Sequence, residues 1–225
     1  MELSFLIGGE AGDGIQRAGY TYAKTLARSG YYVFGYFDYP SLIRGGHNYY
    51  LGHASQRKVY SHVERVDLLA ALNQETLDRH LWRLGDRGIA VYDPGNSKPP
   101  EEFRGRRVEV PFSQIASRHG GRRVMRNMAA VGAMAAVTGL DGEVLSSVIV
   151  DVFGPEKSKL NVKIAGEAYA YTRERYGELL SLGEPTPGER IVLTGNEAIA
   201  VGAVKAGMKF YAAYPITPAS PILHY

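Results

Sequence analysis

The stretch LSFLIGGEAGDG, residues 3–14, joins a short apolar run to a turn with glycines at positions 8, 9, 12 and 14. From Ile15 to Ala27, apolar and small residues recur three and four positions apart while basic residues fall off that stripe, which predicts an amphipathic helix. Residues 31–37 are rich in β-formers and predict the next strand. Strand, helix and strand in this order favour a parallel sheet. We therefore predict a central first strand, parallel to the second.

The same reading extends this unit to residue 181 as a three-layer α/β/α domain with a mainly parallel sheet. The apolar pattern predicts further strands at 48–54, 66–72, 89–92 and 108–110, and helices at 74–84, 128–138, 143–152 and 162–180. The helix at 128–138 is apolar on all sides, so we expect it to be buried.

A second domain is predicted to begin after a proline- and glycine-rich linker at residues 182–189. Beyond it, residues 191–193 and 210–213 predict strands, and Asn196 is placed to cap a helix that Gly207 ends. A further helix is expected from Ser220. About 35 residues are too few to bury a core. We therefore expect residues 190–225 to be the incomplete start of a second α/β domain.

Composition excludes several classes of function. The chain has 225 residues, 45% of them hydrophobic, a net charge of +3 and no cysteine. A chain without cysteine has neither a disulfide framework nor thiolate-ligated clusters, and its histidines lack the spacing of a metal site. The mild charge does not favour nucleic acid. With no long apolar run and no basic leader, we expect a cytoplasmic location.

The glycine turn precedes a helix, where free N–H groups and the helix dipole favour an anion. The known nucleotide motifs do not fit, however. A dinucleotide fingerprint starting at Gly12 and Gly14 would need glycine where Arg17 stands, and a P-loop starting at Gly9 would need lysine where Ile15 stands. An anion site and a purely structural tight turn therefore both remain open.

Two groups of motifs together resemble the 2-oxoacid:ferredoxin oxidoreductases. The first group is GGEAGDGI at 8–15, YPS at 39–41 and RGGHN at 44–48, which is similar to the gamma domain of that family with an acidic version of its glycine loop. The second is GNEA at 195–198 with YPITP at 214–218, which resembles the start of the alpha domain. Gamma followed by alpha on one chain is similar to the fused large subunit of two-subunit archaeal and bacterial enzymes.

The resemblance implies a decarboxylase that uses thiamine diphosphate with magnesium, shared with a beta subunit. Coenzyme A would take the acyl group, and electrons would pass through a 4Fe–4S cluster on a partner chain to ferredoxin. Thr217 is the expected catalytic and substrate contact, with Tyr214, Pro215 and Ile216 beside it. The expected coenzyme A or anion contacts are Gly9, Gly12, Gly14, Arg44, Gly45 and Gly46.

The preferred 2-oxoacid stays open between 2-oxoglutarate, pyruvate and a broad set. The resemblance also places the acid that activates thiamine beyond Tyr225, so we expect the chain alone to be inactive. The abundance of tyrosine and arginine agrees with a thermophilic source. The alternative is a stand-alone nucleotide- or coenzyme-binding module that regulates or scaffolds a partner. A run of arginines from 104 to 126 would, on another reading, bind the acidic groups of coenzyme A or ferredoxin.

Overall fold

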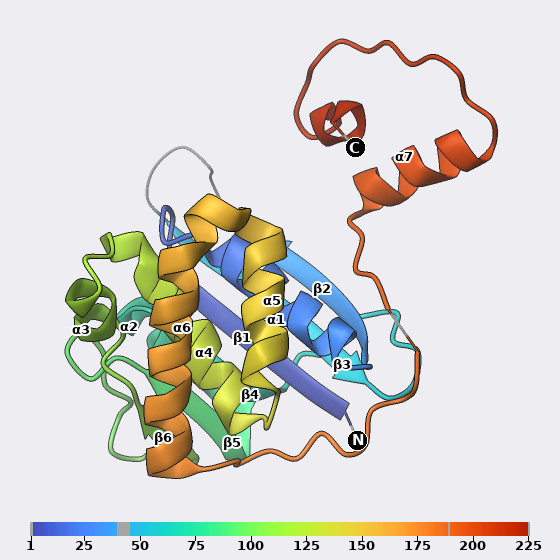
Figure 1. Cartoon of the computed structure of the whole chain (residues 1–225). Helices are drawn as coiled ribbons and strands as arrows, with labels where there is room; N and C mark the ends of the chain where they lie inside the picture. The colour runs from blue at the N-terminus through green and yellow to red at the C-terminus, as the bar shows by residue number, and fades with distance from the viewer. Residues whose placement is uncertain (1, 40–45, 189, 225) are drawn as a thin grey trace. The chain divides into compact units, whose positions relative to one another are not determined.

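A computed structural model describes residues 2–39, 46–188 and 190–224 (Figure 1). The chain divides into two compact units, Met1–Arg190 and Ile191–Tyr225. The strands are β1 (Glu2–Glu10), β2 (Tyr32–Asp38), β3 (His47–Ser55), β4 (Val66–Ala71), β5 (Leu84–Tyr92) and β6 (Arg106–Glu109). The helices are α1 (Ile15–Arg28), α2 (Gln74–His80), α3 (Phe112–Arg118), α4 (Arg126–Val137), α5 (Gly142–Phe153), α6 (Pro155–Tyr176) and α7 (Gly195–Lys205). The 3₁₀ helices are η1 (Leu81–Arg83), η2 (Arg123–Met125) and η3 (Ser220–Leu223).

The first unit is an α/β sandwich around a six-stranded sheet of order β2-β3-β1-β4-β5-β6. Strands β1, β4, β5 and β6 are paired in parallel, whereas β3 is antiparallel to both of its neighbours, β1 and β2. Helices cover both faces of this mostly parallel sheet, so the predicted fold class is confirmed. No helix of the described residues is long and apolar enough to cross a membrane.

Both predictions about the first two strands are correct, although the two strands are not neighbours in the sheet. β1 is central, as expected, but its pairing partners are β3 and β4, and β3 lies between β1 and β2. β1 and β2 do run in the same direction, because β3 is antiparallel to each. The alternation of a half-buried strand looks the same in either direction, so the pattern at residues 47–55 did not reveal the inserted antiparallel strand.

The larger core lies on the sheet face covered by α1, α4, α5 and α6, where Leu3, Phe5 and Ile7 of β1 point. α4 is buried along its whole length, as predicted from its apolar sequence. Gly132 lets it approach α6, because a Cβ there would lie 2.1 Å from the carbonyl oxygen of Ala165. The opposite face holds a smaller core, into which α2 contributes Leu77.

Several predicted boundaries differ from the structure. β1 continues to Glu10, so Gly8 and Gly9 are strand residues, and the turn begins only at Ala11. α6 begins at Pro155 rather than at residue 162 and ends at Tyr176. The helix starts at the pair Gly154 and Pro155. Such a pair usually indicates a break between elements, but proline is well suited to the first turn of a helix. The pattern missed α3, which has only seven residues.

The linker prediction concerned residues 182–189. Those that the structure describes, 182–188, form no helix or strand. They contact the first unit: Tyr31 donates to the carbonyl of Gly183 at 2.7 Å, and Thr186 donates to the carbonyl of Gln56 at 2.9 Å. The assignment of this stretch as a linker between two functional domains stays a prediction.

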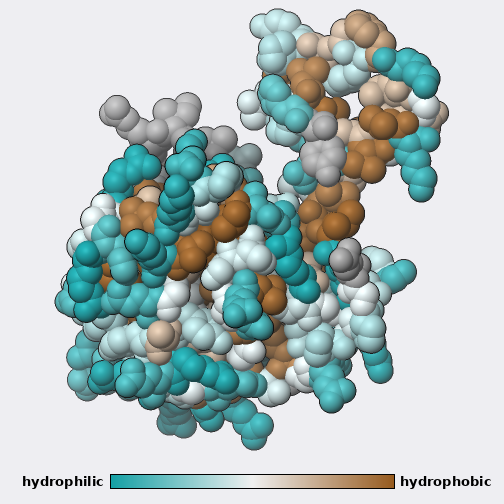
Figure 2. All heavy atoms as spheres, viewed as in Figure 1, coloured by the Kyte–Doolittle hydropathy of each residue, from teal (hydrophilic) through white to brown (hydrophobic). Residues whose placement is uncertain are grey.

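In the second unit, the strands predicted at 191–193 and 210–213 are absent. The helix cap is Thr194 rather than Asn196, because Thr194 and Glu197 form a reciprocal capping box. Large apolar side chains lie at the surface of this unit, where Figure 2 shows brown atoms; Ile191 is 80% exposed, and Phe210 and Tyr214 are each 83% exposed. Two short strands are marginal on their own, and residues 191–224, which the structure describes in this unit, contain no further strand to extend such a pair.

Candidate functional site

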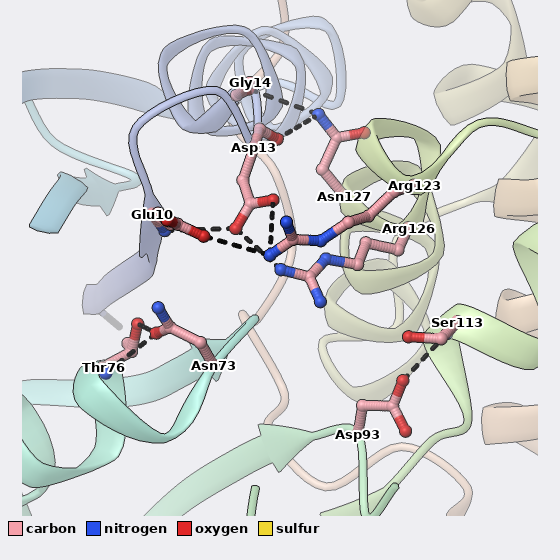
Figure 3. A network of polar contacts seen from close by, with 10 residues as sticks. All are labelled: Glu10, Asp13, Gly14, Asn73, Thr76, Asp93, Ser113, Arg123, Arg126 and Asn127. Atoms are coloured by element: carbon pink, nitrogen blue, oxygen red, sulfur yellow. Dashed lines mark hydrogen bonds and ion pairs between the residues drawn. The ribbon is translucent and has the colours of Figure 1, made fainter. Parts of the chain in front are cut away.

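The candidate site of the first unit lies at the carboxyl ends of the parallel strands. β1 is followed by α1 and leads toward β2, whereas β4 is followed by α2 and leads toward β5. The chain therefore leaves these neighbouring strands in opposite directions. In open α/β sheets, ligands bind at such a point, outside the carboxyl ends of the strands. The glycine loop after β1 lies there, opposite Asn73 and Thr76 after β4 (Figure 3).

The glycines of the loop are required by geometry. Gly12 and Gly14 have φ of 99° and 69°, a region that side chains other than glycine rarely adopt. A Cβ at Gly14 would lie 2.6 Å from Nδ2 of Asn127, and one at Gly9 would lie 2.9 Å from Cδ1 of Ile15. The backbone of the loop thus packs closely against Ile15 of α1 and against Asn127 of α4.

Asp13 lies in the interior of this loop and is paired with a buried arginine. Its Oδ2 accepts from the backbone N–H of Glu10 at 3.1 Å and from Nη2 of Arg126 at 2.7 Å. The Asp13 and Arg126 side chains are only 5% and 6% exposed. A buried charge is tolerated when it is paired and hydrogen-bonded. Asp13, which makes this loop an acidic version of the one it resembles, therefore places a carboxylate of the chain itself inside the loop.

The beginning of α4 holds the loop in place. Nδ2 of Asn127 donates to the carbonyl of Asp13 at 3.0 Å and to that of Gly14 at 3.3 Å. Arg123, just before α4, reaches Glu10 at 3.1 Å but is 67% exposed (Figure 3). α1 has no side-chain cap at its N-terminus and no acidic residue in its first turn. The first-turn N–H groups of α1 therefore have no side-chain acceptor of their own.

Only part of the predicted anion-binding set can be placed. Gly46 joins the glycine loop, because its carbonyl accepts from the N–H of Ala11 at 3.0 Å. Arg44 and Gly45 lie outside the described residues. The arginine run does not form one free basic face, because Arg126 is buried against Asp13 and Arg118 is paired with Glu167.

A pair of buried histidines lies on the other face of the same strand end. Nε2 of His47 and Nε2 of His80 are 2.8 Å apart, and Nε of Arg83 donates to Nδ1 of His80 at 3.3 Å. This donation places the His80 proton on Nε2, so His80 donates and His47 accepts. Burial lowers the pKa of His47, and burial together with the charges of neighbouring His47 and Arg83 lowers the pKa of His80 to about 3. Both rings are therefore neutral near pH 7.

The second unit carries the Tyr214–Pro218 segment. The side chain of Asn196 in α7 donates to the carbonyl of Pro218 at 2.7 Å, so the two motifs of this unit, 22 residues apart, are in contact. Tyr214, Ile216 and Thr217 are exposed, and Ile216 accepts at its carbonyl from the N–H of Ser220 at 2.9 Å. Thr217 precedes a four-residue 3₁₀ turn rather than a regular α-helix.

Sequence reasoning missed the contacts that hold the first site together. The Asp13–Arg126 pair and the Asn127 contacts join segments 113 and 114 residues apart. The one available signal was a polar Arg-Asn pair at the start of an otherwise apolar helix. Asp93, after β5, was also missed. It accepts from the N–H of Gly95 at 3.0 Å and of Ser113 at 2.8 Å, which fixes the turns that follow β5 and start α3.

A family model described as pyruvate ferredoxin/flavodoxin oxidoreductase matches residues 4–171. The chain belongs to this family. The resemblance stated from the motifs is confirmed. In Aeropyrum pernix, 2-oxoacid:ferredoxin oxidoreductase 2, subunit alpha, is 30% identical over 98% of this chain and 42% of its own length. The 2-oxoglutarate oxidoreductase subunit KorA of Mycobacterium tuberculosis is 26% identical over 96% of this chain and 39% of its own length.

Among solved structures, a 2-oxoglutarate:ferredoxin oxidoreductase from Magnetococcus marinus matches with a TM-score of 0.84 and 28% identity, over 100% of this chain and 40% of its own. A keto/oxoacid ferredoxin oxidoreductase gamma subunit from Geobacter sulfurreducens has a TM-score of 0.69 at 24% identity, over 77% of this chain and 98% of its own, which shows a shared fold. The chain thus spans about two fifths of the length of the curated relatives it matches.

Proposed function

We propose that this chain forms part of a thiamine-diphosphate-dependent 2-oxoacid:ferredoxin oxidoreductase. The enzyme would convert a 2-oxoacid and coenzyme A to acyl-coenzyme A and carbon dioxide, with the electrons passing to ferredoxin. The observation that carries this proposal is the match along the whole chain to the Magnetococcus marinus enzyme, whose structure holds 2-oxoglutarate, coenzyme A and succinyl-CoA. Relatives named for 2-oxoacids, 2-oxoglutarate and ketoisovalerate support the substrate class of 2-oxoacids.

In this proposal, the Tyr214–Pro218 segment is one side of the thiamine diphosphate and substrate site. Bound thiamine diphosphate supplies a carbanion nucleophile for the keto carbon. Thr217 donates its hydroxyl to the substrate or cofactor, while Tyr214, Pro215 and Ile216 form the adjacent wall. The segment fits half of a shared site, because its side chains are exposed in this unit while its backbone is held by Asn196. The beta subunit would supply the other half together with magnesium.

The glycine loop is the proposed contact for coenzyme A in the first unit. Gly12, where an added Cβ would meet no atom within 4 Å, leaves the backbone open to a ligand, Gly9 and Gly14 let the loop pack closely beside it, and the uncapped start of α1 favours an anion. Glu10 and Asp13 repel phosphate, but Arg126 already balances Asp13. Arg44, Gly45 and Gly46 would complete this contact. A 4Fe–4S cluster belongs on a partner chain in this scheme, because the chain has no cysteine.

The proposal is tested by co-expressing the full-length subunit that contains these residues with a candidate beta subunit and assaying ferredoxin reduction that depends on coenzyme A. We expect turnover with at least one of 2-oxoglutarate, pyruvate and 2-oxoisovalerate, and none from the chain alone. Activity of the isolated 225-residue chain would contradict the proposal. So would an assembled complex that is inactive with all three acids.

Calorimetry with coenzyme A tests the glycine loop separately. Arg44→Ala should weaken binding by about tenfold, in the range expected for one charge-assisted hydrogen bond. Arg57→Ala, an exposed arginine beyond β3, is the matched control. Equal heats from the two variants would remove Arg44 from the contact.

A further inference from the structure

Two ion pairs close the glycine loop, and they differ in exposure. The Asp13–Arg126 pair has an O···N distance of 2.7 Å, and its side chains are 5% and 6% exposed. The Glu10–Arg123 pair has a distance of 3.1 Å, and its side chains are 50% and 67% exposed. An exposed ion pair contributes little to stability, whereas breaking a buried one leaves an uncompensated charge. Of the two arginines, Arg123 is therefore the one that can change partner while the loop keeps its fold.

The surroundings of Arg123 favour an anion. The starts of α1 and α4 meet at the loop, where Asn127 donates to the carbonyls of Asp13 and Gly14, and neither helix has a side-chain cap. The positive ends of both helix dipoles therefore lie beside the loop. Nε of Arg126 is buried and has no hydrogen-bond partner among the described residues, although its guanidinium points into the loop (Figure 3). A Cβ at Gly12 would meet no atom within 4 Å, so the backbone is open there.

The carboxylates of the loop already use the charge of these arginines. Nη2 of Arg123 lies 3.1 Å from Oε2 of Glu10 and 4.0 Å from Oδ1 of Asp13. Two acids and two arginines cancel, so an incoming anion gains a free positive charge only by displacing a carboxylate. The Glu10 side chain has Arg123 as its sole partner among the described residues, through a single N–H. A phosphate group competes well for this arginine, because its oxygens accept two parallel N–H bonds from one guanidinium.

We propose that Glu10 competes with the phosphate groups of coenzyme A for Arg123. In the free chain Arg123 is paired with Glu10, and in the complex it exchanges Glu10 for phosphate oxygens. Glu10 then turns to solvent, while Asp13 and Arg126 stay paired and keep the loop in place. The inference rests on the proposed contact between the loop and coenzyme A. It adds to that contact a binding residue, Arg123, and an internal competitor that lowers the affinity.

The test is a double-mutant cycle, measured by calorimetry with coenzyme A on the full-length subunit that contains these residues. Glu10→Gln should tighten binding by about three- to fivefold, the strength of one exposed ion pair expressed as an affinity ratio. Arg123→Ala should weaken binding by about tenfold, because one charge-assisted contact is lost. With Arg123→Ala already present, Glu10→Gln should change the affinity by less than about 1.5-fold, because the pair that it releases is gone.

The matched control is Glu174→Gln, which removes the same charge from an exposed residue near the end of α6. It should leave the affinity within about 1.5-fold of the unchanged protein, because distant exposed charges are screened. Thermal melting confirms that each variant is folded.

Two analogues identify the phosphate that Arg123 meets. Dephospho-coenzyme A lacks the 3′-phosphate, and pantetheine lacks every phosphate. If Arg123 meets the pyrophosphate, the tightening by Glu10→Gln persists with dephospho-coenzyme A. If Arg123 meets the 3′-phosphate, the tightening is lost with that analogue. Neither Glu10→Gln nor Arg123→Ala should change the binding of pantetheine.

Equal tightening by Glu10→Gln with and without Arg123 would overturn the proposal, because Glu10 would then act by general repulsion and not by holding Arg123. Absence of tightening, or variants that alter pantetheine binding, would overturn it as well. The outcome for the proposed function is separate. Coenzyme A binding that responds to Arg44→Ala but gives an additive cycle contradicts only the exchange at Arg123. A coupled cycle with inorganic pyrophosphate, without binding of coenzyme A, supports the exchange and contradicts the coenzyme contact. Binding of neither ligand contradicts both.

Discussion

The glycine loop of the first unit and the Tyr214–Pro218 segment of the second are both family motifs, yet they are held very differently. The loop is closed by a buried ion pair and by two hydrogen bonds from Asn127. The Tyr214–Pro218 segment has one hydrogen bond from Asn196 and exposes most of its side chains. The glycine loop, which packs against the core of its unit, is thus preorganised. The Tyr214–Pro218 segment has no such core beside it and keeps its side chains accessible to a partner surface.

The largest expected effect concerns Thr217 in the assembled enzyme. Thr217→Ala should reduce turnover by about 10²-fold or more if the hydroxyl donates to charge that develops during the reaction. Because Thr217 is exposed, its removal should change stability by less than about 1 kcal/mol. Steady-state ferredoxin reduction and thermal melting measure the two effects. A turnover rate within threefold of the unchanged enzyme would mean that Thr217 has only a structural role.

Arg126 is expected to dominate the stability of the glycine loop. Arg126→Ala should destabilise the first unit by about 3–5 kcal/mol, because buried Asp13 would keep only a 4.0 Å contact with the exposed Arg123. The matched control is Arg123→Ala, which removes an exposed arginine beside the same loop and should cost about 0–1 kcal/mol. Urea unfolding gives both values. Similar losses for the two variants would show that burial does not set the difference.

The histidine pair should make the first unit sensitive to acid. The pKa of His80 is lowered from 6.5 to about 3 in the folded chain, so below about pH 6.5 the unfolded chain binds a proton that the folded chain does not. Stability should therefore fall as the pH falls from about 6.5 toward 3. His80→Gln should flatten this dependence in urea unfolding at several pH values. An unchanged slope would exclude His80 as its source.

The smallest effects come from two glycine substitutions that compare the units directly. Gly14→Ala should cost about 1–2 kcal/mol, because φ is 69° and a Cβ would lie 2.6 Å from Asn127. Gly202→Ala in α7 meets no atom within 4 Å and should favour the helix by up to about 1 kcal/mol. Melting curves and helical circular dichroism report the two changes. A stabilising Gly14→Ala would show that the turn is not constrained.

Much of the first unit was predictable because its elements are long and periodic. The strand–helix–strand start, the buried α4 and the fold class all followed from local patterns. The insertion of β3 between β1 and β2 did not, because strand order depends on contacts between distant segments. In the second unit the predicted helix formed, but the two strands did not, because β-structure needs a partner strand whereas helical bonds are local.

The sequence by itself determined the family, because the spacing of its glycine, proline and threonine motifs can be recognised without knowing any tertiary contact. It also placed a glycine-rich turn before the first helix, whereas the structure showed that Gly8 and Gly9 belong to β1 and that Gly12 and Gly14 have positive φ. Only the tertiary structure decided how that turn is held, because Asp13 meets Arg126 across 113 residues and His47 meets His80 across 33. Such pairs cannot be recognised in the sequence, because the residues around each side chain do not indicate its partner. Only folding brings the two side chains together and buries them.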